Sequence, residues 1–299
     1  MVSDSVTDAD IAAYLRRIGL EAEPPSVEAL QRLHRAQVEH VPYETAWIHL
    51  GEQWDIDPLA SMRRVAHEGR GGYCYHLNGA LSLLLAALGY RVTRHVGGVH
   101  GPEGPNTAAL TNHLVLVVSD LPTDANPGGR WYVDAGLGDA LHEPMPMLPA
   151  TYVQPPMTFQ LAATDDGVGD WHLTHDPAGS FTGMSFRESE VGMNVFAARH
   201  EYLSTSPESG FVRVCTVQRR HATGTVILRG CVVTRWTVDG TTMETISRGA
   251  DWFAFVADEL QLKLDRVVPE ALDALWAAVS ASHRAWLVES EAGLAKEPP

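Results

Sequence analysis

The chain has 299 residues, of which 45% are hydrophobic and 20% charged, a composition typical of a globular protein. Its formal net charge of −15 argues against a nucleic-acid-binding protein, because no basic stripe outweighs the acidic residues. The longest apolar run, near residues 80–88, is too short to span a bilayer, and the first residues lack the pattern of a signal peptide. We therefore expect a soluble, cytoplasmic protein of two or three structural units that binds neither nucleic acid nor membrane.

Two side chains mark helix starts in the first 89 residues: Thr7 precedes an acidic first turn, and Ser26 precedes an apolar helical face. Val41-Pro42 ends the second helix, because the residue before a proline is driven out of the α region. The sequence predicts helices over residues 7–18, 26–41, 58–68 and 74–88. Residues 42–45 are expected to form an ordered loop.

From Tyr90 the pattern changes to the alternation and β-branched residues that are typical of strands. Gly97-Gly98 and residues 101–106 are expected to form a mobile loop. Strands are predicted over residues 90–96, 113–118, 130–134, 158–162, 171–174 and 181–187. This middle part is predicted to be a β-barrel or a strongly bent sheet.

The last hundred residues mix both patterns. A helix over 193–202 is followed by predicted strands at 211–217, 223–229, 231–238 and 241–246. Asp251 is expected to cap one further helix, and Pro269 to open the last one. The tail, 292–299, is expected to fray.

Cys74 follows the pair Gly71-Gly72 and opens an apolar helix. Backbone N–H groups and the helix dipole at that end favour a thiolate, which is the nucleophilic form of cysteine. The three cysteines, Cys74, Cys215 and Cys231, are widely spaced and do not form a disulfide pattern. Taken alone, a free cysteine is more often a small buried apolar residue, so this alternative stays open.

A nucleophilic cysteine needs a base, and the base needs an orienting group. His113 begins one predicted strand and Asp134 ends the next, so both side chains lie at one sheet edge if those strands are neighbours. Each also has an ordinary explanation, His113 as a core histidine and Asp134 as a turn-forming aspartate. The pattern alone therefore predicts a candidate Cys-His-Asp site without proving that the three residues meet.

The histidines do not show the spacing of a metal site. Cys74-x-His76 has no second close pair, and His95, His100 and His142 are isolated. We therefore predict that the chain binds no metal.

The stretch Arg70-Gly71-Gly72-Tyr73-Cys74, followed by Asn78, resembles the R-G-G-x-C-x-x-x-N signature of arylamine N-acetyltransferases. Residues 41–44, 111–114, 132–138 and 202–211 resemble further segments of that family in the same order. The resemblance implies an α+β fold of three domains with a core like that of cysteine proteases of the papain type and transglutaminases. It places an N-terminal helical bundle with the nucleophile at 1–89, a β-barrel with the His and Asp at 90–192, an interdomain helix at 193–205 and a C-terminal α/β lid at 206–299.

The resemblance also implies an acyltransferase in which Cys74 carries the acyl group, His113 is the base and Asp134 orients it. Acetyl-CoA, the acyl donor and co-substrate, acylates Cys74 in a ping-pong cycle, and the nitrogen of an arylamine, hydrazine or related small-molecule amine then attacks the thioester. Backbone N–H groups, one of them from Cys74, are expected to hold the oxyanion. Substrate and CoA contacts are expected from Arg70, Gly72, Tyr43, Thr111, Leu137, Gly138, Ser204 and Thr205.

Three departures from the family pattern leave the acceptor open. His76 replaces a usually acidic residue, Leu137 stands where a phenylalanine often lines the acceptor pocket, and residues 181–186 lack the usual Trp/Tyr pattern. These departures are compatible with the amide synthases of natural-product biosynthesis, which form amides or macrolactams from an acyl carrier protein thioester. A papain-type hydrolase and a non-enzymatic binding protein are the remaining alternatives.

Overall fold

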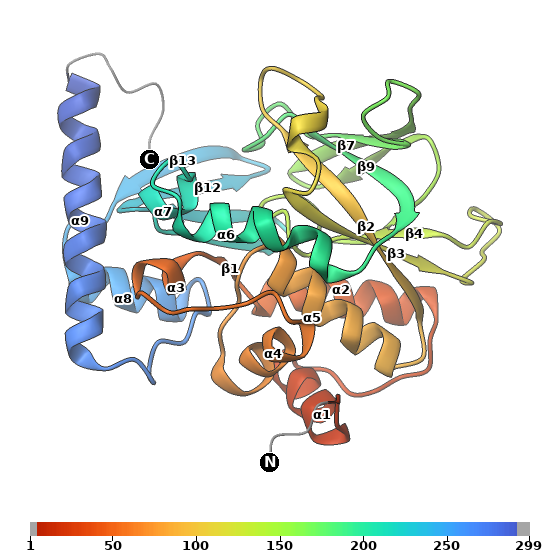
Figure 1. Ribbon diagram of the computed structural model, residues 1–299, viewed down its shortest axis with the longest axis horizontal. Helices are drawn as coiled ribbons and strands as arrows, with labels where there is room; N and C mark the ends of the chain where they lie inside the picture. Colours follow the sequence, from red (N-terminus) through yellow and green to blue (C-terminus); the bar gives the residue numbers. More distant parts are fainter. Residues whose placement is uncertain (1–4, 292–299) are drawn as a thin grey trace.

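The computed structural model describes residues 5–291, so the tail predicted to fray, 292–299, lies outside the described residues. The fold is α+β, with N-terminal helices, a nearly closed antiparallel barrel and a C-terminal sheet flanked by helices (Figure 1). No helix within residues 5–291 is both long and apolar enough to cross a membrane.

The N-terminal helices begin where the sequence predicts. The Thr7 hydroxyl accepts from the backbone of Asp10, whose carboxylate accepts from the backbone of Thr7, and Ser26 caps the second helix through the backbone N–H of Ala29. The elements are α1 (Asp8–Arg17), α2 (Val27–His40), α3 (Ala46–His49), α4 (Pro58–Arg63), a π-helical turn η1 (Arg64–Glu68) and α5 (Cys74–Ala87). Helix α5 is buried along most of its length, which explains its apolar sequence.

The barrel strands follow the order β5-β4-β3-β2-β9-β8-β7-β6, all antiparallel. They are β2 (Arg91–His100), β3 (His113–Ser119), β4 (Trp131–Val133), β5 (Met145–Pro146), β6 (Ala150–Gln154), β7 (Met157–Ala163), β8 (Trp171–Thr174) and β9 (Gly183–Glu190), with a 3-10 turn η2 (Thr107–Ala109) after β2. The two edge strands are joined where the Tyr152 hydroxyl donates to the carbonyls of Pro146 and Leu148 at 2.9 and 3.0 Å.

The expected loop at Gly97-Gly98 is wrong, because both glycines lie inside β2 and pair with neighbouring strands. A Cβ atom on Gly97 would lie 2.9 Å from the Val115 side chain. Gly97 therefore allows close packing between strands, and Gly98 allows the backbone of Ala109 to approach β2.

Strand β3 is buried on both faces, as its continuous apolar sequence predicts. Leu116 and Val118 pack against the N-terminal helices, whereas Val115 and Val117 face the barrel interior. This strand therefore joins the helical core to the barrel core.

The C-terminal sheet has the order β1-β10-β11-β12-β13. Its strands are β1 (Tyr43–Glu44), β10 (Thr216–His221), β11 (Gly224–Arg229), β12 (Val232–Thr237) and β13 (Gly240–Thr245). The predicted loop at 42–45 is wrong in part, because Tyr43 and Glu44 form β1 and pair with β10. The first part of the chain thus supplies the edge strand of this sheet, and the domain boundaries given above stay predictions.

Helices complete this region: η3 (Met193–Phe196), α6 (Ala197–Thr205), α7 (Gly210–Arg213), α8 (Gly249–Asp258) and α9 (Pro269–Glu291). The strand predicted over 211–217 is wrong for residues 211–215, because the Ser209 side chain caps α7 there and β10 begins only at Thr216. Asp251 lies inside the first turn of α8 and binds Arg248, so it is not the predicted cap. Pro269 opens α9 as predicted.

Candidate active site

Cys74 is the first residue of α5, and the glycines before it hold the chain close to its neighbours. A Cβ atom on Gly71 would lie 1.8 Å from the Pro42 carbonyl oxygen, and Gly72 has a φ of +127°, so neither position accepts another residue without strain. Gly136 packs as tightly from the other side, since a Cβ there would lie 2.6 Å from Cys74 Cα. Cys74 is 4% exposed, and its sulfur donates to the Asn112 carbonyl at 3.7 Å.

Asp134 is buried and receives hydrogen bonds from four donors. His113 Nε2 and the Tyr132 hydroxyl donate to Oδ2 at 2.7 and 2.6 Å, and Asn78 Nδ2 and the backbone N–H of Gly136 donate to Oδ1 at 2.8 and 2.9 Å. Burial alone would raise the pKa of Asp134, but the His113 charge and these hydrogen bonds lower it below its ordinary 3.8. The carboxylate is therefore ionised at neutral pH.

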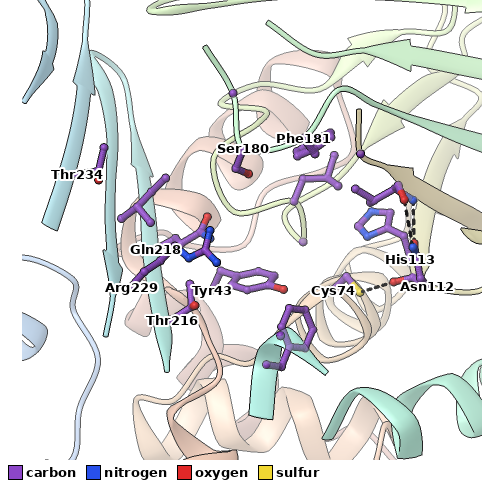
Figure 2. A pocket seen from close by; sticks show the side chains of 18 of the residues that line it. Tyr43, Cys74, Asn112, His113, Ser180, Phe181, Thr216, Gln218, Arg229 and Thr234 are labelled. Carbon is purple, nitrogen blue, oxygen red and sulfur yellow. Dashed lines mark hydrogen bonds between the residues drawn. The ribbon is translucent and has the colours of Figure 1, made fainter. Parts of the chain in front are cut away.

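His113 binds this carboxylate and interacts with the Cys74 sulfur. His113 and Cys74 both line one cavity (Figure 2). Burial alone would lower the pKa of His113, but the Asp134 carboxylate and the Cys74 sulfur outweigh it and raise the value to about 10. Because Asp134 occupies Nε2, Nδ1 is left for the thiol proton. The structure therefore brings together the three side chains that the sequence predicted.

Asn78, the last residue of the sequence motif, lies in α5 and binds three other residues. Its amide donates to the carbonyl of Leu114 at 2.6 Å and to Asp134, and its oxygen accepts from the backbone of Ala135 at 2.9 Å. One buried amide thus joins α5 to β3 and to the turn after β4. Its position one helical turn after Cys74 is the signal that could have revealed it.

A cavity of about 640 Å³ opens in front of Cys74 and His113. Its opposite wall is one face of the C-terminal sheet, because alternate strand residues point the same way. These wall residues are Thr216, Gln218, Ile227, Arg229, Val232, Thr234, Trp236, Thr241 and Met243. Apart from histidines, the charged residues in the described wall are Arg199 and Arg229, with no carboxylate among them, although the whole chain is acidic.

Tyr43 and Leu137 line this cavity, whereas the other predicted contact residues do not. The residues outside the described wall are Arg70, Gly72, Thr111, Gly138, Ser204 and Thr205. Arg70 is buried against Glu44 and Glu52, and the hydroxyls of Ser204 and Thr205 bind carbonyls of their own helix. The Thr111 carbonyl accepts from Tyr75, and Gly138 packs against Gln218 of the wall.

His76 lies beneath the site rather than in the cavity. Its ring is fully buried among aromatic side chains, with Trp47 and Tyr73 at centroid distances of 5.5 and 4.7 Å, and its Nδ1 accepts from the backbone of Tyr73. Burial lowers the pKa of His76 well below 6.5, so the ring is neutral and adds no charge near Cys74.

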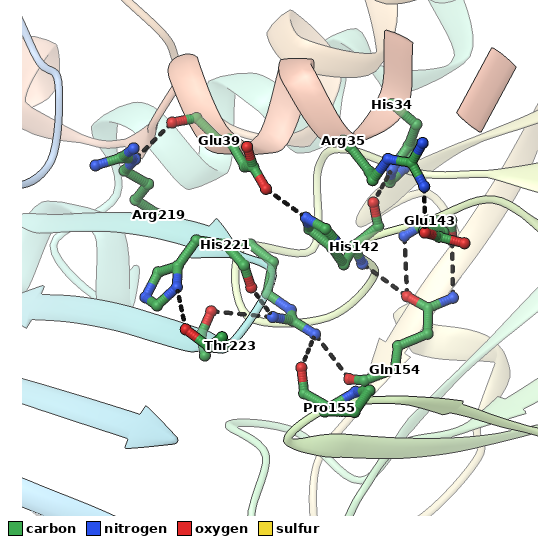
Figure 3. A network of polar contacts seen from close by, with 12 residues as sticks. His34, Arg35, Glu39, His142, Glu143, Gln154, Pro155, Arg219, His221 and Thr223 are labelled. Carbon is green, nitrogen blue, oxygen red and sulfur yellow. Dashed lines mark hydrogen bonds and ion pairs between the residues drawn. The ribbon is translucent and has the colours of Figure 1, made fainter. Parts of the chain in front are cut away.

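A polar network holds the chain segment that follows Asp134 (Figure 3). Glu39 of α2 pairs with His142 Nε2 at 2.6 Å, and His34 Nδ1 donates to the His142 carbonyl at 3.0 Å. The other nitrogen of His34 accepts from the backbone of Asp134 at 3.4 Å. The helix α2 therefore contacts Asp134 directly and fixes the loop beyond it.

Arg220, which is buried, fixes the same loop to the C-terminal sheet. Its guanidinium donates to the carbonyls of Ala140, Gly224, Gln154 and Pro155 at 2.8–3.0 Å. Burial lowers the pKa of Arg220 to about 10, so it still carries its charge at neutral pH.

Among residues 5–291 no three His, Cys, Asp or Glu side chains form a group that could hold a metal ion. The metal-free site stays a prediction.

The sequence and the fold around this site are similar to those of known proteins. Residues 26–268 match the model of a family described as N-acetyltransferase. The chain is 30% identical over 231 residues to the arylamine N-acetyltransferase pineal gland isozyme of Gallus gallus, covering 70% of this chain and 78% of that one. It is 32% identical over 165 residues to proansamycin X synthase of Amycolatopsis mediterranei, covering 53% of this chain and 60% of that one. The solved structure of Mycobacterium marinum arylamine N-acetyltransferase in complex with CoA superposes with a TM-score of 0.79 at 23% identity, covering 91% of this chain and 99% of that one.

Replacing Asn78 by alanine tests the amide that joins three elements. Asn78→Ala removes the buried hydrogen bonds to the Leu114 carbonyl, the Ala135 N–H and the Asp134 carboxylate, and should lower the free energy of unfolding by about 2–4 kcal/mol. Urea denaturation measures the change. Asn194→Ala, at an exposed position, is the matched control and should stay within about 0.5 kcal/mol of wild type. Equal losses for both variants would contradict the assignment.

The His113–Asp134 pair also predicts how stability depends on pH. Because folding raises the pKa of His113 from 6.5 to about 10, the imidazolium stabilises the folded state fully below pH 6.5 and loses this effect as pH rises towards 10. The stability difference between wild type and His113→Gln should therefore shrink between pH 7 and pH 10 in urea titrations. A difference that stays constant over this range would show that His113 is neutral in the folded protein.

Proposed function

This chain belongs to the arylamine N-acetyltransferase family, and we propose that it moves an acetyl or other short acyl group from CoA through Cys74 to the nitrogen of an arylamine, hydrazine or related amine. The observation that carries the proposal is the buried row of sulfur, imidazole and carboxylate at the wall of a cavity large enough for substrates.

In the first half-reaction His113 holds the proton of Cys74, and the thiolate attacks the acyl carbon of the donor thioester. A carbon–sulfur bond forms, the carbonyl electron pair moves to oxygen, and the adduct then expels CoA as a thiolate that takes the proton from His113. Asp134 keeps the imidazole in the orientation that presents Nδ1 to the sulfur.

In the second half-reaction the acceptor amine enters the emptied cavity and attacks the acyl-cysteine. His113 takes a proton from the attacking nitrogen, and the Cys74 thiolate is expelled as the amide forms. The two substrates thus use one cavity in turn, which gives the ping-pong order.

The charge of the cavity wall supports an anionic donor. Arg199 and Arg229 line the wall without a carboxylate in its described part, so the local potential opposes the acidic charge of the whole chain. CoA carries phosphate groups that such a wall attracts, and the superposed structure from Mycobacterium marinum is a CoA complex.

An amide synthase that takes its acyl group from a carrier protein is the second candidate. It is favoured by the aliphatic Leu137 in the cavity wall and by the similarity to proansamycin X synthase. It uses the same three residues and differs only in the donor.

Intact-protein mass spectrometry tests the acyl-enzyme. Incubation with excess acetyl-CoA and no acceptor should add one acetyl group to the wild type and none to Cys74→Ala, whereas Cys231→Ala, which alters a cysteine of the C-terminal core, should still be acylated. The absence of any adduct with a panel of short acyl-CoA donors would contradict the proposal. Loading from a carrier-protein thioester alone would favour the amide synthase, and rapid release of free acid without acceptor would favour a hydrolase.

Exchanging an arginine of the wall tests the donor. Arg229→Gln should raise the KM for acetyl-CoA by about twofold to fivefold, because an exposed charge pair contributes modestly, and should leave the KM for the uncharged donor p-nitrophenyl acetate unchanged. Added salt should reduce the difference. Arg235→Gln is the matched control, since Arg235 lies on β12 and pairs with Glu244 outside the described wall. An equal effect on both donors would show that Arg229 does not bind the phosphates.

A further inference from the structure

Tyr43 is held from two sides, and this fixes the direction of its ring. Its strand β1 pairs with β10, with Tyr43 opposite Gln218, and its other side bridges to Gly72, two residues before Cys74. The backbone N–H of Glu44 donates to the Gly72 carbonyl at 2.9 Å. The ring therefore starts from a backbone that cannot move independently of the nucleophile.

From this anchor the Tyr43 side chain runs along the cavity wall, and Figure 2 shows its hydroxyl pointing towards Cys74. The ring of Phe211 packs edge-on against it, with centroids 6.3 Å apart. His113 stands on a different side of the sulfur, so the sulfur lies between the imidazole and the phenol in this view.

The hydroxyl of Tyr43, which is half-buried, differs from those of the buried tyrosines. A side-chain or carbonyl partner in the protein binds the hydroxyl of each of Tyr14, Tyr73, Tyr75, Tyr90 and Tyr132. No hydrogen bond within residues 5–291 involves the hydroxyl of Tyr43, which faces the cavity instead. A polar group held towards a cavity without a protein partner is suited to bind a ligand atom.

Burial, together with the nearby Cys74 sulfur, raises the pKa of Tyr43 well above 10. The phenol therefore keeps its proton throughout the working pH range and can only be a neutral donor or an acceptor, not an anion.

We propose that the Tyr43 hydroxyl donates a hydrogen bond to the oxyanion that forms when Cys74 attacks an acyl carbonyl, an inference that rests on the proposed function. The new carbon–sulfur bond pushes the carbonyl electron pair onto oxygen, the phenol donates to this oxygen, and no proton is transferred. When the adduct collapses, the C=O bond forms again, the leaving group departs and the hydrogen bond weakens. Tyr43 thereby adds a side-chain donor to the backbone N–H groups expected at the start of α5.

The alternative role for a hydroxyl near the sulfur is to stabilise the resting thiolate. Two reactions of Cys74, acylation and alkylation, distinguish this role from oxyanion binding. Acylation of Cys74 passes through an oxyanion, whereas alkylation by iodoacetamide at a saturated carbon does not. Loss of a donor to the oxyanion therefore slows acylation alone. Loss of a donor to the thiolate slows both reactions and shifts their pH profiles.

Tyr43→Phe, which keeps the ring and removes only the hydroxyl, is the test. Its single-turnover acylation by acetyl-CoA and by p-nitrophenyl acetate should be about 10²-fold slower at saturation with little change in the half-saturating concentration. Its rate of alkylation by iodoacetamide between pH 5 and pH 9 should match that of wild type. Tyr152→Phe, the same change at the barrel edge, is the control and should leave both rates unchanged.

Three results for Tyr43→Phe would overturn the inference. These are slower alkylation with a shifted pH profile, a change only in the half-saturating donor concentration, and an unchanged acylation rate. Thermal unfolding of Tyr43→Phe checks that its fold is intact, and the alkylation rate checks the nucleophile in the same sample. A wild type that is alkylated but never acylated would contradict the proposed function itself, whereas normal acylation of both proteins would contradict this inference alone.

Discussion

The buried carboxylate of Asp134 is the constraint on which the rest of the site depends. A carboxylate away from water is costly unless every lone pair is satisfied, and here four donors converge on two oxygens. The donors come from α5, from β3, from β4 and from the turn that follows. Helix and strands must therefore meet in one register, and the same register places the imidazole of His113 beside the sulfur of Cys74. The hydrogen bonds that stabilise the fold here are the ones that orient the His113 imidazole.

Residues far from the cavity maintain this register. The backbone of Asp134 is held by His34 of α2, and the following loop is fixed both to α2 through His142 and to the C-terminal sheet through Arg220. Close backbone packing also holds the loop in place, because Gly136 lies directly against Cys74. The site is thus assembled from segments that belong to helices, barrel and sheet, and a displacement of any one of them would be transmitted to the carboxylate.

Much of the secondary structure around the site could be predicted from residues that are close together in the sequence. The N-caps at Thr7 and Ser26, the apolar helix that begins at Cys74 and the strand that ends just before Asp134 depend on near neighbours in the chain, and the structure agrees with them. The strand pattern predicts that Cys74, His113 and Asp134 meet only if β3 and β4 are neighbours, which they are, and the family resemblance indicated the same three residues. The errors have long-range causes. Tyr43 and Glu44 become a strand only because β10, more than a hundred residues later, pairs with them, and Gly97-Gly98 stay extended only because β3 and β9 flank them. Which face of the last sheet lines the cavity also depends on that pairing.

The two walls of the cavity come from different parts of the chain. The wall with the candidate reactive residues is therefore distinct from the wall that faces it. Cys74, His113 and Asp134 come from the helices and the barrel, whereas the opposite wall comes from the C-terminal sheet. Under the proposed function, sequence changes in the sheet alter the substrate-facing wall without altering these three side chains. Strand β1 is where the two meet, because Tyr43 is paired to the sheet and bridged to the glycine turn before the nucleophile. The backbone of the sheet wall is thus continuous, through Tyr43 and Gly72, with the start of the helix that carries Cys74.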